Sequence, residues 1–381
     1  MKTANFTKEL GHRLQEKRNA LNFPPKVMFE LTYRCNLDCR HCYIVKDPSK
    51  RELSSAQVKS LLGQIADAGC LHVIFTGGEP LVRKDLFSLI AYARRRGLFV
   101  HLFTNATLLD ERDAVILKGL GLISLEISLY SAKRERFDFI TRRRGSFDRL
   151  MNALMVLKKS EVRFVLNSLI MNLTLDEIGD LKHLADSFGA DIWWNQFLLP
   201  KRDGSRENLR FRLEPEEIMK AITSIDAVST LDAAGSAGNG TCSADIEVSR
   251  NATETDSVFR NKFFSCGVGI KNSLVISPYG ELLPCANLPS IGISAIKEGI
   301  RKGWKRLIEY TSSLRPSADY KCDGCELRSF CLSCPALAGL ECGNINSCPQ
   351  FHREFAELKR QKYETDRKVK DLRGHHAYGK L

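Results

Sequence analysis

No stretch of this sequence approaches the roughly 20 consecutive apolar residues that a membrane-spanning helix needs. The N-terminal segment, Met1 to Glu9, also lacks the basic region followed by an apolar region that marks a secretory signal peptide. We therefore expect no membrane contact and a cytoplasmic protein.

Acidic residues are in deficit, because 45 Asp and Glu face 57 Lys and Arg, for a formal net charge of +12. Such an excess is typical of nucleic-acid-binding proteins. One basic run, Arg94 to Arg96, ends an amphipathic helical pattern, where cations interact favourably with the helix dipole. The apolar fraction of 43% indicates a globular chain, and 381 residues suffice for a barrel plus an appendage.

The chain is rich in cysteine, with 13 residues that gather in clusters. Because the chain is neither small nor marked for secretion, metal ligation is favoured over disulfides. Three thiols fall within Cys35-Asn-Leu-Asp-Cys39-Arg-His-Cys42, a spacing that lets one short loop wrap a single metal centre. A structural zinc ion or a 4Fe-4S cluster usually takes four protein ligands. Three thiolates therefore indicate an iron that is open to an exogenous ligand.

Apolar strand patterns alternate with amphipathic helix patterns from Lys26 onward. This alternation predicts an α/β fold, a parallel (β/α)6 partial barrel of the TIM type with right-handed crossovers, whose chemistry lies at the C-terminal strand ends. Ser54 is predicted to cap the first of these helices, which runs through Ala68. The predicted strands are 26–33, 72–76, 99–104, 122–129, 162–170 and 190–199, and further helices are predicted at 85–96 and 214–225.

The spacing Cys35-x3-Cys39-x2-Cys42 resembles the signature of the radical S-adenosylmethionine (SAM) superfamily, and Gly77-Gly78-Glu79-Pro80 resembles the family's GGEP motif after the second strand. The resemblance implies a 4Fe-4S cluster on the three cysteines, with its open iron chelated by the amino and carboxylate groups of SAM. It also implies reductive cleavage of SAM to a 5′-deoxyadenosyl radical, which abstracts a hydrogen atom from substrate. A zinc knuckle is the alternative for the triplet alone.

The resemblance also implies roles for other strand-end residues. It assigns the GGEP backbone, with Glu79 nearby, to the methionyl amino group of SAM. Thr104-Asn105-Ala106 resembles a Thr-Asn-Gly at the third strand end, and Ser128 matches a serine that approaches the ribose or carboxylate. Further candidates are Asn167 and one arginine of Arg142 to Arg144, of which we select Arg142, for the cofactor, and Glu126 either for catalysis or as a structural ion-pair partner.

The sixth predicted strand carries Trp193 and Trp194, which alternation sends to opposite faces. One is expected to pack in the barrel and the other to face adenine or substrate. The pattern does not choose between them.

A second cysteine field follows a small, flexible segment, and a hairpin turning at Pro278-Tyr-Gly280 is predicted to bring Cys285 back toward Cys266. The field resembles a SPASM domain, which holds auxiliary 4Fe-4S clusters, although Cys331 and Cys334 are one residue closer than usual. The fourth ligand of the first cluster is left open between Cys242, Cys342 and none, and a pair of zinc ribbons is the alternative. The resemblance implies one cluster on Cys266, Cys285 and Cys334, and a second on Cys322, Cys325, Cys331 and Cys348. Cys70, at a helix end, is expected to be a buried free thiol.

We therefore expect an N-terminal helix at 1–24, a radical SAM core at 25–230, a linker at 231–262, a SPASM domain at 263–350, and a C-terminal helix and tail at 351–381. Three clusters would lower the net charge to about +7, which makes a nucleic acid an unexpected partner.

The leading functional hypothesis is a radical SAM oxidoreductase that matures a peptide or protein. The segment before the first strand is far shorter than the precursor-binding domain of some such enzymes. A separate small recognition protein, or direct peptide binding, is therefore expected, together with an electron donor such as flavodoxin or ferredoxin. Small-molecule or cofactor biosynthesis and a zinc-bound scaffold without enzymatic activity are the alternatives.

Overall fold

The computed structural model describes residues 23–230, 263–264, 266, 268–269 and 271–377. They form an α/β fold around one mostly parallel sheet with the strand order β6-β5-β4-β3-β2-β1-β7-β8. Neighbouring strands are parallel except for β8, which is antiparallel to β7. Strands β6 and β8 are the two ends of this order, so the sheet is an open partial barrel, as the alternating pattern predicts.

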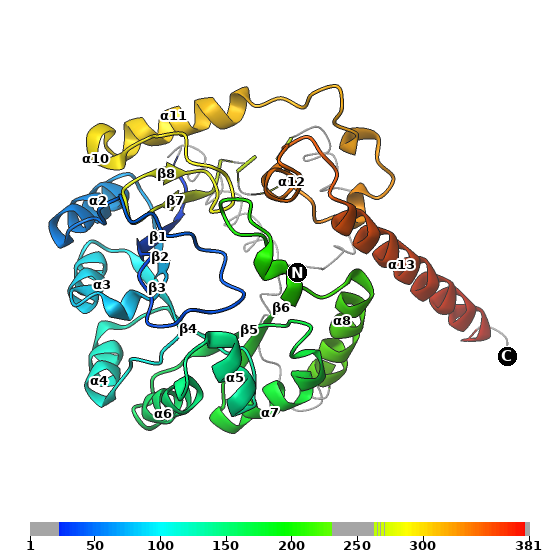
Figure 1. Ribbon diagram of the computed structural model, residues 1–381, viewed down its shortest axis with the longest axis horizontal. Coiled ribbons are helices and arrows are strands. Elements are labelled where there is room, and N and C mark those ends of the chain that lie inside the picture. The colour runs from blue at the N-terminus through cyan, green and yellow to red at the C-terminus, as the bar shows by residue number, and fades with distance from the viewer. Residues whose placement is uncertain (1–22, 231–262, 265, 267, 270, 378–381) are drawn as a thin grey trace, which may run out of the picture.

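The first six strands alternate with helices on the outside of the sheet (Figure 1). Each lies inside or within one residue of its predicted range. The six are β1 (Lys26–Thr32), β2 (His72–Gly77), β3 (Phe99–Thr104), β4 (Ser124–Ser128), β5 (Val165–Leu169) and β6 (Asp191–Asn195). The helices of this region are α2 (Ser55–Asp67), α3 (Leu86–Arg95), α4 (Glu111–Leu120), α5 (Arg134–Thr141), α6 (Ser146–Lys159), α7 (Ile178–Phe188) and α8 (Pro215–Thr230).

Local capping explains where several helices begin and end. Ser54 caps α2 as predicted, because its hydroxyl accepts from the Gln57 N–H while the Gln57 side chain accepts from the Ser54 N–H. Asp110 and Asp113 form the same reciprocal arrangement at the start of α4. Both pairs satisfy N–H groups that have no partner within the helix.

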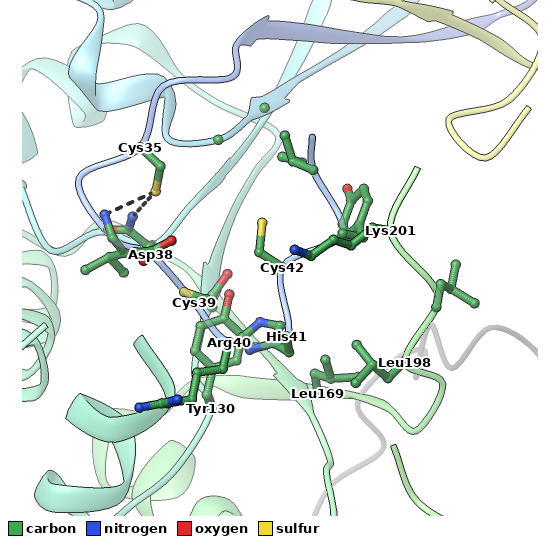
Figure 2. A pocket seen from close by; sticks show the side chains of 18 of the residues that line it. Cys35, Asp38, Cys39, Arg40, His41, Cys42, Tyr130, Leu169, Leu198 and Lys201 are labelled. Carbon is green, nitrogen blue, oxygen red and sulfur yellow. Dashed lines mark hydrogen bonds between the residues drawn. The ribbon is translucent and has the colours of Figure 1, made fainter. Parts of the chain in front are cut away.

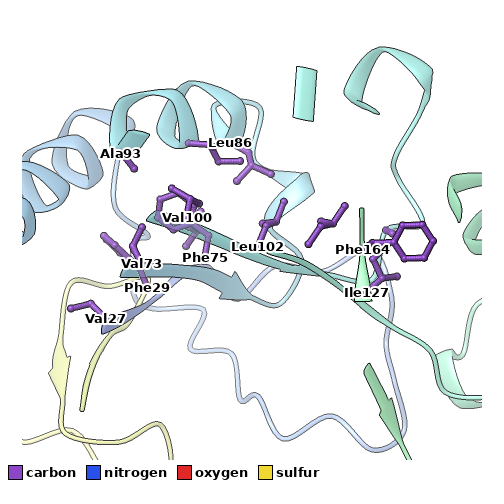
Figure 3. Close-up of a cluster of buried hydrophobic side chains, with 14 of the residues drawn as sticks. Val27, Phe29, Val73, Phe75, Leu86, Ala93, Val100, Leu102, Ile127 and Phe164 are labelled. Carbon is purple, nitrogen blue, oxygen red and sulfur yellow. The ribbon is translucent and has the colours of Figure 1, made fainter. Parts of the chain in front are cut away.

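The hydrophobic core lies between the outward faces of the strands and the surrounding helices (Figure 3). Phe29 on β1 packs edge to face against Phe75 on β2, with ring centroids 6.5 Å apart, and both rings are fully buried. Trp194 on β6 also belongs to this core, whereas Trp193 is half-buried on the opposite face. The packing role that alternation left open between the two tryptophans therefore belongs to Trp194.

The predicted hairpin of the second cysteine field is present as β7 (Leu274–Ile276) and β8 (Leu282–Leu283). Strand β7 also pairs in parallel with β1, which the sequence did not predict. The C-terminal region therefore continues the sheet of the core. Its other elements are α10 (Ala295–Glu298), α11 (Ile300–Ser313), α12 (Pro335–Cys342), α13 (Gln350–Ala377) and the short 3-10 turns η4 (Cys322–Gly324) and η5 (Arg328–Phe330).

Helix α13 closes the C-terminal region onto the core, because it packs against α8. Phe355 of α13 meets Phe197, which follows β6, with ring centroids 5.2 Å apart. Two predicted segments, the N-terminal helix and the linker at 231–262, lie almost entirely outside the described residues, and Cys242 lies there too. Within the described ranges, no helix is both long and apolar enough to span a bilayer.

Candidate active site

A cavity of about 460 Å³ opens at the C-terminal ends of the parallel strands. The cysteine loop after β1 forms one wall, and each following strand contributes a residue at or near its end (Figure 2). These strand-end residues are Thr76, Gly77, Phe103, Thr104, Ser128, Asn167, Leu169 and Asn195. This is the face on which barrel enzymes place their chemistry.

Cys35, Cys39 and Cys42 all line this cavity, and Figure 2 shows their side chains projecting from one short loop. Burial raises the pKa of all three thiols, and the charge of Cys42 raises the pKa of Cys35 and Cys39 further. Three free thiolates would therefore repel one another here, whereas bound metal deprotonates coordinating thiols outright.

The loop is held in place by backbone contacts with the end of α5. The Asp38 N–H donates to the Thr141 carbonyl at 3.2 Å, and the Arg40 N–H donates to the Ile140 carbonyl at 2.9 Å. Asn105, at the end of β3, donates from its amide to the Asn36 side chain at 3.0 Å and to the Cys35 sulfur at 3.7 Å. The positions of the sulfur atoms are thus set by two neighbouring elements.

This donor set fits a three-thiolate 4Fe-4S cluster. Among the described residues, no fourth cysteine lines the cavity. In the same ranges, no three histidine, cysteine or carboxylate side chains converge in the way that a single metal ion requires. In a cubane cluster each thiolate binds a different iron, so its sulfurs surround a larger volume.

The GGEP turn packs directly against the start of the cysteine loop. A Cβ atom on Gly77 would lie 2.1 Å from the Thr32 carbonyl oxygen, and one on Gly78 would lie 2.4 Å from that of Arg34. The Gly78 N–H donates to the Thr32 carbonyl at 2.7 Å. Both glycines line the cavity. A side chain at either position would collide with the backbone at the start of the cysteine loop, so this contact alone requires glycine.

Glu79 is fully buried beneath the cavity and is absent from its lining, as is Pro80, which begins the 3-10 turn η1 (Pro80–Val82). Its carboxylate accepts hydrogen bonds from the Thr104 hydroxyl and the Asn105 N–H, both at 2.6 Å, and from the Leu81 N–H at 2.9 Å. Burial raises the pKa of Glu79 to about 7 against these donors. In the protein itself, Glu79 ties the ends of β2 and β3 together, and its contact with SAM stays a prediction.

Thr104 and Asn105 both line the cavity, and the residue after them has an unusual backbone. Ala106 has φ of 56°, in the left-handed region that favours glycine. This explains why the resembling motif usually has glycine there. The Thr104 hydroxyl accepts from the Ala106 N–H at 2.9 Å and stabilises the turn.

The remaining cofactor candidates also reach the cavity. Ser128 and Asn167 are register partners on β4 and β5, and both line it. Of the three consecutive arginines, only Arg142 does so, and its guanidinium lies 3.4 Å from the Asp38 carboxylate. The basic run joins α5 to α6, as expected for a loop before a helix.

Glu126 lies one layer below the cavity, two residues before Ser128 on β4, and does not line it. The Ser124 hydroxyl donates to its carboxylate at 3.3 Å, and burial raises the pKa of Glu126 to about 7, against hydrogen bonds from Ser124 and Asn167. Among the described residues, no basic side chain lies within ion-pair distance of Glu126, so the structural alternative takes the form of hydrogen bonds. Its catalytic role stays a prediction.

Several lining residues were missed by the sequence analysis. His41 is buried, its ring meets that of Tyr130 with centroids 4.3 Å apart, and its Nδ1 has no hydrogen-bond partner among the described residues. Its place between two of the motif cysteines was the available signal. Lys46, Lys201 and Arg210 also line the cavity, but they lie in connecting segments or a 3-10 turn where no periodicity marks them.

The second cysteine field divides into two groups. Cys266 and Cys285 both raise the pKa of Cys334 by their charge, after burial, and Cys285 and Cys334 pack against one small apolar cluster. The other four, Cys322, Cys325, Cys331 and Cys348, line a second cavity of about 410 Å³, which Cys334 also borders. The role of these cysteines as ligands of two auxiliary clusters stays a prediction.

The structure also gives the positions of Cys342 and Cys70, which belong to neither proposed auxiliary set. Cys342 is exposed, and its charge raises the pKa of Cys348, so it lies toward the second group. Cys70 is the buried free thiol that was expected, with sulfur contacts to the carbonyls of Pro25 and His72 at 3.4 and 3.2 Å. Burial raises the pKa of the Cys70 thiol to about 12.

Comparison with known proteins decides the family. Residues 29–185, which include the three cysteines and the GGEP turn, match the Radical SAM superfamily. These residues form a radical SAM domain. Membership implies a 4Fe-4S cluster and SAM, and the cavity of this chain carries the three thiols that such a cluster needs.

The relatives of this chain act on different substrates. It is 27% identical over 330 residues to an AdoMet-dependent heme synthase of Methanosarcina barkeri, covering 83% of this chain and 93% of that protein. It is 31% identical over 202 residues to the PqqA peptide cyclase of Gluconobacter oxydans, covering 49% of this chain and 56% of that protein.

Solved structures share the fold of this chain. SuiB of Streptococcus suis bound to its precursor peptide SuiA has a TM-score of 0.65 at 16% identity, over 90% of this chain and 79% of that one. The structure of anSMEcpe with AdoMet and the Kp18Cys peptide has a TM-score of 0.66 at 16% identity, over 92% and 99%.

Proposed function

We propose that Cys35, Cys39 and Cys42 hold a 4Fe-4S cluster whose open iron is chelated by SAM, and that the cavity beside them is where a substrate hydrogen is removed. When bound, the cluster supplies one electron that splits SAM into methionine and a 5′-deoxyadenosyl radical, which takes a hydrogen atom from substrate. The single observation that carries this proposal is the convergence of three thiols and the ends of five strands, β2 to β6, on one cavity.

The strand-end residues would bind and orient SAM. The backbone of Gly77 and Gly78 and the polar side chains of Thr104, Asn105 and Ser128 offer hydrogen-bond partners without a net charge. Arg142 offers a guanidinium to the SAM carboxylate, although Asp38 already compensates part of its charge. Asn167, the register partner of Ser128, offers an amide from the neighbouring strand.

The second cysteine field would hold auxiliary clusters. Cys266, Cys285 and Cys334 form one proposed ligand set, and the four cysteines around the second cavity form the other. Clusters in that position would accept an electron from a substrate radical, return it to the chain, or bind substrate. In this proposal the domain boundaries of the sequence analysis are kept, with the core and the SPASM domain sharing one sheet.

For the substrate we propose a peptide or protein that is being matured into a crosslinked, oxidised or epimerised product. The similarity to the PqqA peptide cyclase supports this choice. A separate small recognition protein and an electron donor such as flavodoxin or ferredoxin are proposed partners. A small-molecule substrate is the second candidate, because the similarity to the heme synthase extends over 93% of that protein.

Anaerobic reconstitution tests the reaction. The reconstituted protein, supplied with SAM and dithionite, is expected to release 5′-deoxyadenosine, and Cys39→Ala is expected to release none. Zinc in place of iron, with no 5′-deoxyadenosine, would contradict the proposal and favour a scaffold. Deuterium transfer into 5′-deoxyadenosine from a labelled candidate peptide would then identify the substrate class.

A further inference from the structure

The cavity of the proposed active site is divided electrostatically into two sides. The side built from the ends of β2 to β5 carries hydroxyl, amide and backbone groups, including Thr104, Asn105 and Ser128. The other side is built from the end of the cysteine loop and the segment after β6. It carries Lys46, Lys201 and Arg210, with one acid, Glu207.

Two cations of this second side, Lys46 and Lys201, line the same cavity as the third cysteine, Cys42. In Figure 2 the Lys201 side chain extends toward Cys42. The positive charge therefore lies close to the proposed cluster on the side away from the strand ends that would bind SAM.

The other charged residues of the lining are Asp38, Arg40 and Arg142, and the Arg40 guanidinium donates to the Phe139 carbonyl and lies over the Phe139 ring. Arg202 pairs with Glu30, and Arg142 pairs with Asp38. Lys201 contacts Glu207, so it is partly compensated. Among the described residues, no carboxylate lies within ion-pair distance of Lys46 or Arg210. The second side therefore keeps a net positive charge of two within the described chain.

Arg210 is held for such a role by its neighbours. Its guanidinium lies over the Phe211 ring, 4.8 Å from the centroid, and its carbonyl accepts from the Asn172 amide at 2.9 Å. Lys201 is fixed at the base of a turn, where its N–H donates to the Ser205 carbonyl at 3.0 Å. Anchored cations lose little conformational entropy when they bind an anion.

We propose that Lys46, Lys201 and Arg210 form a carboxylate-binding side of the cavity and that the substrate presents at least two carboxylates to it. This inference rests on the proposed function, since it concerns the substrate of the same site. The ammonium and guanidinium groups donate charge-assisted hydrogen bonds, which are stronger than neutral ones. Two sources supply this chemistry, an acidic peptide and a small polycarboxylate.

Equilibrium binding to the anaerobically reconstituted full chain tests this inference without turnover. The probes are metal-free coproporphyrin, which carries four carboxylates, and a fluorescent glutamate-rich peptide. Coproporphyrin methyl ester and a glutamine-for-glutamate peptide are the uncharged controls. We expect at least one acidic probe to bind, with an affinity that falls as salt rises, and its uncharged control to bind at least tenfold more weakly.

We expect each of the variants Lys46→Gln, Lys201→Gln and Arg210→Gln to lower the binding affinity for the acidic probe by about tenfold. Lys118→Gln removes the same charge from the exposed surface of α4, remote from the cavity, and serves as the matched control. Whichever acidic probe binds more tightly identifies the source of the carboxylates.

Three results would overturn the inference: uncharged controls that bind as well as the acids, variants that bind the acids like the parent, or no carboxylate-dependent binding by either probe. A fourth contrary result is a loss of SAM binding in the variants equal to the loss of the acidic probe, because the cations would then serve the cofactor. Release of 5′-deoxyadenosine by the parent protein is measured separately. Failure of the carboxylate site thus remains distinct from failure of the proposed reaction.

Discussion

The guanidinium of Arg202 binds the carboxylate of Glu30 in a two-point contact, with Nη1 to Oε2 at 2.9 Å and Nη2 to Oε1 at 2.5 Å. The Tyr33 hydroxyl completes the group, donating to Glu30 and accepting from Arg202. Glu30 lies inside β1, and Arg202 lies beyond β6. The ion pair therefore links the first strand to the segment that follows the last strand of the partial barrel.

This ion pair gives the first prediction. Arg202→Gln leaves the Glu30 carboxylate buried without its partner, which costs about 3–5 kcal/mol of unfolding free energy. The double variant Glu30→Gln, Arg202→Gln is expected to recover part of that loss because no buried charge remains. Urea unfolding of the metal-free chains measures both. A single variant within about 1 kcal/mol of the parent would show that the pair is not desolvated.

The second prediction concerns the GGEP turn. Gly78→Ala forces the backbone apart from the Tyr33 and Arg34 carbonyls, 2.8 and 2.4 Å from the new Cβ, and overpacking of this kind costs about 1–3 kcal/mol. We also expect less iron per chain after reconstitution, because the cysteine loop begins there. Gly119→Ala in α4, where nothing lies within 4 Å, is the control and should be neutral or slightly stabilising. Equal iron contents in the two variants would contradict the role given to the glycines.

The third prediction is a pH dependence at Glu126. Its folded pKa of about 7 lies above its ordinary value of 4.5, so the folded state holds the proton more tightly. The stabilisation is complete below pH 4.5 and is lost as pH rises through 7. Lys26 faces this carboxylate and opposes the shift, and Ser124 and Asn167 donate to it.

Glu126→Gln removes that proton equilibrium. Its unfolding free energy relative to the parent should therefore rise between pH 5 and pH 8. Urea unfolding of metal-free protein at four pH values checks this, and an offset that does not change with pH would exclude the shift.

The fourth prediction separates the cluster from the other thiols. Cys35→Ala should lose about four irons per chain while keeping those of the second cysteine field. It should also lose SAM-dependent absorbance changes and 5′-deoxyadenosine. Cys70→Ala is the matched control, because this thiol is buried in the hydrophobic core, its sulfur donates to backbone carbonyls, and it should keep full iron. Iron loss in the Cys70 variant would mean that burial alone, and not ligation, explains the effect.

The sequence predicted what depends on local pattern. The Ser54 cap and the alternation within each strand are short-range signals, and they predicted the elements of the partial barrel. The spacing of the three cysteines is also local, and it predicted the three-thiol site. The parallel pairing of β7 with β1 joins residues about 250 positions apart, and neither strand carries a signal of the other. The orientation of Glu79 depends on the 3-10 turn after it, which strand alternation does not describe.

The cationic side of the cavity shows a second limit. In the sequence, nothing distinguishes Lys46 and Arg210 from other charged residues. Only the folded chain brings these two exposed side chains to the same cavity. The same holds for Arg202 and Glu30, whose pairing decides which positive charges near Cys42 are compensated. Charge at a site is a sum over distant segments, so composition alone does not reveal it.

Strand β1 runs into Cys35, and the hairpin that precedes Cys285 is hydrogen-bonded to the flank of that same strand. The loop that carries Cys35 and the segment that carries Cys285 therefore extend from neighbouring strands of one sheet. Clusters in the two proposed places would thus be connected through paired strands of this sheet, which would help to keep the separation on which electron transfer between them depends.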